Sequence, residues 1–203
     1  EIMSLGLIAL LISMVCSLWL GLLVAWPMII FGAAALLLGY FYSVPPVRYA
    51  DWGFGIGESG LFVALGLLPA VASYYAQVGR LDALALWSGV PFAMLVSLIF
   101  LTHSLLHHRR DWLIRKRTLA VSLGLGRAID LSTVLVIGAF IFILFAATVS
   151  HLPLRTLIAL LGLPIATGAY TQLDRKSLPP AQGARLYTAA IHATLATALL
   201  YTL

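Results

Sequence analysis

Seven long runs of mostly apolar residues follow one another along this chain. A transmembrane helix needs about 20 apolar residues to cross the hydrocarbon core of a bilayer, and within lipid only helices and closed barrels satisfy every backbone hydrogen bond. We therefore predict an all-α, polytopic membrane helix bundle of seven transmembrane helices, formed as a single membrane domain over residues 1–203. The predicted spans are residues 3–24, 26–42, 57–77, 84–106, 129–150, 153–171 and 184–203.

The composition agrees with a location in the lipid bilayer. Hydrophobic residues make up 62% of the sequence and charged residues 9%, whereas soluble domains carry about 25% charged residues. The net charge of +5 does not indicate a nucleic-acid partner, because the basic residues lie in short loops between apolar spans. No basic segment followed by a small-residue cleavage site opens the sequence, so we expect no signal peptide.

The Lys and Arg residues are distributed unevenly between the two predicted membrane faces. Only Arg80 and Arg155 lie on the face opposite residue 1. Because Lys and Arg concentrate in cytoplasmic loops, we expect an integral protein of the inner or plasma membrane whose polar loops face the cytoplasm. The ten basic residues on the cytoplasmic side are Arg48, Arg109, Arg110, Arg115, Lys116, Arg117, Arg127, Arg175, Lys176 and Arg185.

Polar and ionisable residues crowd together in the segment from Thr102 to Gly124. His103, His107 and Asp111 recur at i, i+4 and i+8, which places them on one face of a continuous helix. Two imidazoles and a carboxylate at a membrane mouth can hold a cation. The alternative is that the basic residues here are ordinary topology signals flanking a span and that the histidines are simply solvated.

A second polar loop, Y-S-V-P-P-V-R at residues 42–48, follows the second apolar run. Its two prolines hold the backbone extended, so Tyr42 and Arg48 can direct a hydroxyl and a guanidinium at one ligand. The alternative is an interfacial tyrosine anchor and an arginine that only fixes topology. We expect residues 42–58 to face residues 103–117 at the cytoplasmic end. His151 and His192 are predicted to be structural or interfacial.

Taken together, these segments resemble the UbiA superfamily of intramembrane prenyltransferases. Residues 42–48 are similar to that family's Y-S-x-P-P-x-R/K loop, and residues 57–58 (G-E) and 72–79 (A-S-Y-Y-A-Q-V-G) are similar to segments of its dihydroxynaphthoate polyprenyltransferase (MenA) branch. The most specific piece is K-R-T-L-A-V-S-L-G at residues 116–124, which resembles the G-K-R-T-L-A-V-x-L-G segment of that branch. The resemblance covers essentially the whole chain and implies the last seven of the family's nine helices.

The chain departs from the family pattern at both of the family's acidic motifs. The first, N-D-x-x-D in the family's second helix, has no counterpart in this sequence. In the second, aligned on Lys116, His107 stands where the family has its first aspartate and Asp111 keeps the second aspartate. His103 and Ser104 stand at the two asparagine positions. Because imidazole suits softer metals than Mg²⁺, we predict weaker Mg²⁺ binding and weak or absent activity with Mg²⁺.

The resemblance also implies a reaction and a set of site residues. In this family Mg²⁺ binds the diphosphate of a polyprenyl diphosphate and neutralises it as the allylic C–O bond ionises. An aromatic or quinone-precursor acceptor, as in menaquinone biosynthesis, then attacks the carbocation. The alternative is a non-catalytic relative that binds an isoprenoid or quinone, or serves as a subunit. Carried onto this sequence, the site residues are Tyr42 and Asp111 as catalytic groups, Arg48, Arg110, Lys116 and Arg117 at the diphosphate, and Asp111, His107 and His103 at the metal.

Overall fold

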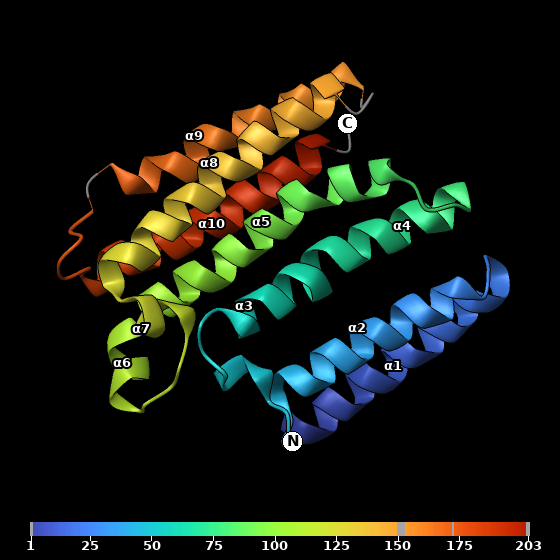
Figure 1. Ribbon diagram of the computed structural model, residues 1–203, viewed down its shortest axis with the longest axis horizontal. Helices are drawn as coiled ribbons and strands as arrows, with labels where there is room; N and C mark the ends of the chain where they lie inside the picture. Colours follow the sequence, from blue (N-terminus) through green and yellow to red (C-terminus); the bar gives the residue numbers. More distant parts are fainter. Residues whose placement is uncertain (1, 150–152, 172, 202–203) are drawn as a thin grey trace.

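The computed structural model describes residues 2–149, 153–171 and 173–201, and the regular structure in these residues is entirely helical. Figure 1 shows the long helices lying side by side along one common direction. His151, residue 150 of the fifth predicted span and residues 202–203 of the seventh lie outside the described residues. The α-helices are α1 (Ile2–Leu23), α2 (Pro27–Ser43), α3 (Ile56–Leu61), α4 (Leu68–Val78), α5 (Ala83–Leu106), α6 (His108–Leu113), α7 (Leu119–Leu123), α8 (Leu125–Val149), α9 (Leu163–Thr167) and α10 (Pro180–Tyr201).

Short stretches of other helical geometry complete the longer segments. The π-helical segment η2 (Phe62–Leu67) joins α3 to α4, so these three elements form one continuous helical segment. The 3₁₀-helices η3 (Leu154–Gly162) and η4 (Gly168–Tyr170) flank α9 in the same way. A further 3₁₀ turn, η1 (Tyr49–Asp51), lies in the loop between α2 and α3.

A helix is found at each of the seven predicted positions, but the described helices differ in their capacity to cross a bilayer. Two apolar segments, Pro27–Ser43 and Leu154–Tyr170, are shorter than a typical span. The helix α10 is long but less apolar, because polar residues such as Arg185 and His192 interrupt its sequence. Four helices are both long and apolar enough to cross a membrane: Leu5–Leu23, Ile56–Val78, Ala83–Leu106 and Leu125–Val149.

The helix α5 lies at the centre of the packing, where it contacts α8, α10 and η2. Leu95 and Leu98 of α5 pack there against Phe140 of α8 in one buried cluster. Many of the other buried residues are alanines, which let helix backbones approach closely in a membrane protein. At Gly66 of η2 a side chain would collide with the backbone of Ala93 in α5, so this contact requires glycine.

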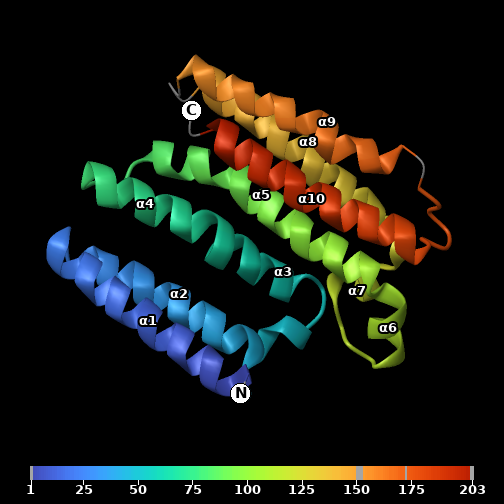
Figure 2. The same cartoon turned by 180° about the vertical axis from the view of Figure 1, so that it is seen from behind.

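The helices α1 and α2 form a hairpin at one side of this bundle (Figures 1 and 2). The helix α1 packs against α2, and α2 in turn contacts η1, η2 and α3–α4. Gly32 of α2 lies directly against the side chain of Ser17 of α1. Most large side chains of α1 are exposed, for example Leu11 and Trp19, as expected of a helix whose surroundings are lipid rather than protein.

Three loops gather at one end of the molecule, the left end in Figure 1. The first joins α2 to α3, the second joins α5 to α7 through the short α6, and the third precedes α10. The turns after α1 and after α4 lie at the other end. This arrangement puts the two polar segments found in the sequence at the same end of the bundle.

Candidate functional site

The loop after α2 folds back onto the end of that helix. The Tyr49 hydroxyl donates a hydrogen bond to the Leu38 carbonyl oxygen at 2.8 Å, and its ring packs edge-on against Tyr42 with the centroids 5.5 Å apart. Burial raises the pKa of Tyr49, so its hydroxyl keeps its proton near neutral pH. The Trp52 indole N–H donates to the Val47 carbonyl oxygen at 2.7 Å. These contacts fix the loop that carries Arg48, whose guanidinium pairs with Asp51 at 2.7 Å.

The segment after α5 turns sharply before it reaches the bundle again. The helix α5 ends at Leu106, and His107 has φ −100° and ψ 8°, outside regular helix geometry. The short helix α6 follows and places Asp111 in a buried position, with 7% of its surface exposed. The chain then returns through Lys116, whose backbone N–H donates to the Asp111 carbonyl oxygen at 2.9 Å.

The two loops are joined directly by hydrogen bonds. The Glu58 carboxylate, at the start of α3, accepts a hydrogen bond from the backbone N–H of Leu119 at 3.0 Å. The backbone N–H of Phe54 also reaches the Ser122 hydroxyl at 3.5 Å. Gly53 and Gly55 both have positive φ, which glycine adopts without strain. Those two glycines let the first loop lie close against residues 117–122.

A small cavity of about 130 Å³ lies between the two loops, and we name it the polar cavity. Its walls combine two carboxylate residues, one lysine, one histidine and three hydroxyl residues. A second hollow of about 340 Å³ shares Lys116 with it, and its other lining residues are Arg48, Asp51, Ile114, Arg115 and Arg117; we name this the basic cavity. The polar cavity is lined by Tyr42, Ala50, Gly57, Glu58, Leu61, Phe100, His103, Ser104, Asp111, Lys116 and Thr118.

The structure brings most of the residues proposed from the sequence into these two cavities. Tyr42, His103, Asp111 and Lys116 line the polar cavity, and Arg48, Lys116 and Arg117 line the basic cavity. The prediction that residues 42–58 face residues 103–117 is therefore confirmed. Arg110 lines neither cavity, because it lies on the exposed side of α6.

The proposed metal set consists of His103, His107 and Asp111. Within residues 2–149, 153–171 and 173–201, no group of three His, Cys, Asp or Glu side chains is placed to hold a metal ion. The backbone hydrogen bonds from His107 to the His103 carbonyl oxygen and from Asp111 to the His107 carbonyl oxygen keep the i, i+4, i+8 spacing, at 3.1 and 2.9 Å. The His107 ring packs against His103, with the centroids 4.6 Å apart, and does not line the polar cavity.

Glu58 and Thr118 line the polar cavity, although the sequence did not single them out as site residues. A signal for both was present, because Gly57-Glu58 and K-R-T-L-A-V are the segments in which the chain resembles the UbiA family. Nothing in the spacing of the residues indicates that positions 58 and 118 are neighbours. That information comes from the fold.

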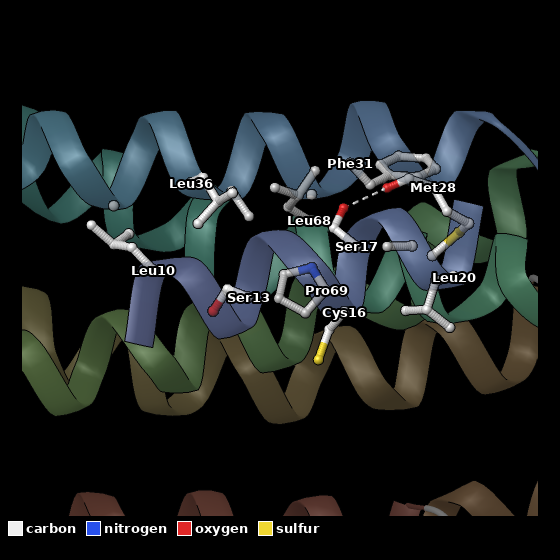
Figure 3. A pocket seen from close by; sticks show the side chains of 14 residues that line it. Leu10, Ser13, Cys16, Ser17, Leu20, Met28, Phe31, Leu36, Leu68 and Pro69 are labelled. Carbon is white, nitrogen blue, oxygen red and sulfur yellow. Dashed lines mark hydrogen bonds between the residues drawn. The ribbon is translucent and has the colours of Figure 1, made fainter. Parts of the chain in front are cut away.

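A pocket near α1 and α2 has a different character (Figure 3). It has a volume of about 510 Å³, lies between α1, α2 and α4, and has no charged residue in its wall. Its polar groups are those of Ser13, Cys16 and Ser17, and the Ser17 hydroxyl donates to the Met28 carbonyl oxygen at 3.3 Å. We name this the apolar pocket.

A comparison with known protein families decides the identity of this chain. The model of the UbiA prenyltransferase family matches residues 3–195. The chain belongs to the UbiA prenyltransferase family. It is accordingly an integral membrane protein with several apolar helices, as the helices of Figure 1 also indicate.

Two curated UbiA-family relatives are similar to this chain. A 1,4-dihydroxy-2-naphthoate octaprenyltransferase of Mycobacterium leprae (strain TN) is 30% identical over 150 residues, which is 73% of this chain and 50% of the relative. The enzyme of the same name from Bacillus subtilis (strain 168) is 24% identical over 119 residues, or 59% of this chain and 38% of the relative. The chain thus spans 50% of the length of the first relative and 38% of the length of the second. No solved structure matches it significantly.

Proposed function

We propose that this UbiA-family chain transfers a polyprenyl group from a prenyl diphosphate to an aromatic or quinone-precursor acceptor. The observation that carries the proposal is the polar cavity, where a buried carboxylate and a lysine lie together at the end of a membrane bundle. The two relatives are named as 1,4-dihydroxy-2-naphthoate octaprenyltransferases. We therefore propose a similar naphthoate acceptor and a role in menaquinone biosynthesis.

The basic side chains of the two cavities are the proposed diphosphate ligands. Arg48 and Arg117 line the basic cavity, and Lys116 lines both cavities. A guanidinium group can bind phosphate oxygens through two parallel hydrogen bonds, whereas a lysine acts as a point charge. Arg110 lies outside both cavities and is not proposed to contact the diphosphate in this conformation.

The UbiA family is generally Mg²⁺-dependent, and one feature of the polar cavity fits that ion. Asp111 is buried, yet its carboxylate forms no ion pair within the described part of the chain. A buried carboxylate without a cation is costly, and Mg²⁺ is commonly held by one or two carboxylates together with substrate phosphates. Asp111 is therefore the residue that would hold Mg²⁺, and the bound ion would neutralise the charge of the leaving diphosphate.

Other side chains of the polar cavity have proposed roles beside Asp111. Lys116 adds positive charge where negative charge develops on the leaving diphosphate, and such preorganised charge stabilises a transition state. The Tyr42 hydroxyl orients a reacting group from the opposite loop. His103 stands beside Asp111 in the wall of the cavity, and its neutral imidazole is a poorer Mg²⁺ ligand than a carboxylate. We therefore propose a Mg²⁺ dependence weaker than a pair of aspartates gives.

The membrane arrangement is also a proposal. We propose that all seven helical segments cross the bilayer as one membrane domain, with the short α2 and α9 segments tilted less than the long α5 and α8. The ten-to-two distribution of Lys and Arg supports a cytoplasmic location for both cavities. A ligand with a charged diphosphate head and an apolar chain then has its head at the cytoplasmic surface and its chain among the helices.

A second candidate function is a non-catalytic relative that binds an isoprenoid or a quinone, or acts as a subunit. The observation that favours it is the missing three-ligand cluster within the described residues. The two candidates differ in one measurement. Purified chain in lipid vesicles is given a labelled polyprenyl diphosphate, 1,4-dihydroxy-2-naphthoate and Mg²⁺, and the prenylated naphthoate is extracted and quantified. Product above the level of protein-free vesicles supports the transferase, and its absence at saturating substrate supports the non-catalytic relative.

A further inference from the structure

The first residue to consider is Thr118, which stands at the N-cap position of α7. Its backbone is extended, with φ −75° and ψ 162°, as an N-cap residue should be. A threonine in this position normally accepts a hydrogen bond from a backbone N–H of the first helical turn. Here the Thr118 hydroxyl makes no such bond. Thr118 therefore has the backbone conformation of an N-cap residue, but its side chain makes no capping hydrogen bond.

Glu58 accepts a hydrogen bond from the first residue of this helix. Its Oε1 accepts from the backbone N–H of Leu119 at 3.0 Å, and Glu58 lies at the start of α3, 61 residues earlier in the chain. A carboxylate at the beginning of a helix also interacts favourably with the helix dipole. A Thr118 cap would accept from the N–H of Ala120 or Val121. The Glu58 bond to Leu119 therefore holds the first residue of α7 and does not engage the Thr118 hydroxyl.

The Thr118 hydroxyl is buried but has no hydrogen-bond partner. The residue is only 6% exposed, and its Oγ1 contacts no donor or acceptor among the residues that the structure describes. Leaving a buried hydroxyl unsatisfied costs free energy, so an unpaired group of this kind needs an explanation. Thr118 lines the polar cavity, together with Asp111 and Lys116. The missing partner is therefore a group that enters that cavity.

We propose that the Thr118 hydroxyl is a substrate-binding group that donates a hydrogen bond to a diphosphate oxygen of the prenyl substrate. Glu58 is the positioning residue that holds the beginning of α7, next to Thr118, through the Leu119 N–H. This inference rests on the proposed function, because it takes the ligand of the polar cavity to be a prenyl diphosphate. Lys116 two residues earlier brings a positive charge to the same wall, and so the ligand oxygen that Thr118 contacts is anionic.

A matched pair of variants tests the role of Thr118. Thr118→Val keeps the shape of the side chain and removes the hydroxyl. Thr197→Val removes another buried, unpaired threonine hydroxyl, in α10 and outside the wall of the polar cavity. Farnesyl diphosphate, with Mg²⁺, is titrated into the purified chain and each variant, and thermal unfolding is measured without ligand. Thr118→Val should weaken binding about 5- to 20-fold, as expected for a lost hydrogen bond to a charged group, and Thr118→Ser should restore it.

The unfolding measurement separates this role from a structural one. Because the Thr118 hydroxyl is unpaired without ligand, Thr118→Val should unfold at the same temperature as the wild type or higher. If Thr118→Val unfolds at a lower temperature and binds farnesyl diphosphate like the wild type, the hydroxyl has a structural role and the inference is overturned. Thr197→Val should leave binding unchanged. If the wild-type chain does not bind farnesyl diphosphate at all, the proposed function fails; if it binds and Thr118→Val binds equally well, only this inference fails.

Two variants of Glu58 complete the experiment. Glu58→Gln keeps an oxygen that accepts from Leu119, so it should bind farnesyl diphosphate within about 3-fold of the wild type, since the hydrogen bond to the helix end is retained. Glu58→Ala loses this hydrogen bond and should lower both the affinity and the unfolding temperature. Equal loss of binding in Glu58→Gln and Glu58→Ala, with unchanged unfolding temperatures, would contradict the positioning role, because it would assign the effect to the charge alone.

Discussion

The polar cavity and the apolar pocket are both hollows between membrane helices, but they are built in opposite ways. The polar cavity is formed where two loops that are distant in the sequence meet, and Glu58 joins them through Leu119. The apolar pocket is formed by the α1–α2 hairpin, whose helices are consecutive, together with α4 (Figure 3). The smaller hollow contains charged and unpaired groups, whereas the larger one contains none that is charged.

The volume of a hollow is therefore a poor guide to its function in a membrane bundle. Apolar helix faces leave hollows that lipid chains can fill at little cost, since lipid and apolar side chains are chemically alike. A buried carboxylate at the edge of the membrane is expensive and is usually kept for a function. We therefore expect substitutions in the polar cavity to change ligand binding and turnover, and substitutions in the apolar pocket to change stability only.

The largest effect is expected at Asp111, which has the buried carboxylate. Asp111→Asn removes the negative charge with little change of shape, so the vesicle assay should show kcat/KM lower by about 100-fold or more, as for the loss of one preorganised electrostatic group. The matched control is Asp130→Asn, because Asp130 is exposed on α8 and pairs only with Arg175. An exposed pair contributes little, and the control should turn over like the wild type. If Asp111→Asn and Asp130→Asn had equal kcat/KM values, the buried carboxylate would matter no more for turnover than an exposed one.

Arg48 should show the next largest effect. Arg48→Ala removes a guanidinium from the wall of the basic cavity, and the dissociation constant of farnesyl diphosphate should rise about 10-fold, because a hydrogen bond to a charged group is lost. Arg80→Ala is the control, since Arg80 is also exposed and also lies near an aspartate, Asp82, but at the other end of the bundle. If the affinity fell in Arg80→Ala and was unchanged in Arg48→Ala, the diphosphate would bind at the opposite end of the bundle.

Much of the fold could be predicted from the sequence, because apolar runs determine where helices form in a bilayer. The predicted run at 84–106 corresponds to α5 at Ala83–Leu106, almost residue for residue. The fifth run was placed later than its helix, since α8 already begins at Leu125 and includes the polar residues Arg127 and Asp130. A helix that extends beyond the hydrocarbon layer keeps its backbone hydrogen bonds in polar sequence, and hydropathy does not detect that part.

The candidate site could be predicted less completely. The facing of the two loops followed from charge counting and from the clustering of polar residues, and the cavities contain Tyr42, Arg48, Asp111 and Lys116. The metal set of His103, His107 and Asp111 stays a prediction, and its spacing alone did not show that His107 lies outside the polar cavity. The role of Thr118 depends on a hydrogen bond that is absent, and a sequence contains no information on unpaired atoms.

The apolar pocket gives the complementary prediction, which concerns stability alone. Gly32 and Gly39 both line it, but a side chain at Gly32 would collide with Ser17 of α1, whereas nothing lies within 4 Å of such a side chain at Gly39. Gly32→Ala should therefore lower the free energy of unfolding by about 1–3 kcal/mol, as overpacking does, with unchanged binding of farnesyl diphosphate. Gly39→Ala should be neutral or slightly stabilising. A loss of ligand binding in Gly32→Ala, without unfolding, would show that the apolar pocket takes part in substrate binding.

The smallest effect is expected at Asp82, which lines neither hollow and lies where α4 turns into α5. The Tyr74 hydroxyl donates to Asp82 at 2.6 Å and the Leu84 N–H donates to it at 2.9 Å, and these bonds lower the pKa of Asp82 below 3.8. A carboxylate with a lowered pKa stabilises the folded state above its unfolded pKa, and this contribution is lost as the pH falls through the lower, folded value. Thermal unfolding should therefore separate Asp82→Asn from the wild type at pH 7, and the difference should shrink below pH 3.8. A difference that is independent of pH would mean that the charge of Asp82 has no part in it.

The central claim is that the charged end of the bundle binds the diphosphate, and Lys116 tests it most directly because it lines both cavities. The measurement is calorimetric titration of farnesyl diphosphate, with Mg²⁺, into purified wild-type chain and Lys116→Ala, with Lys176→Ala as the control from the loop before α10. The account predicts saturable binding to the wild type, at least about 10-fold weaker binding to Lys116→Ala, and unchanged binding to Lys176→Ala. Equal affinities in all three proteins would contradict it.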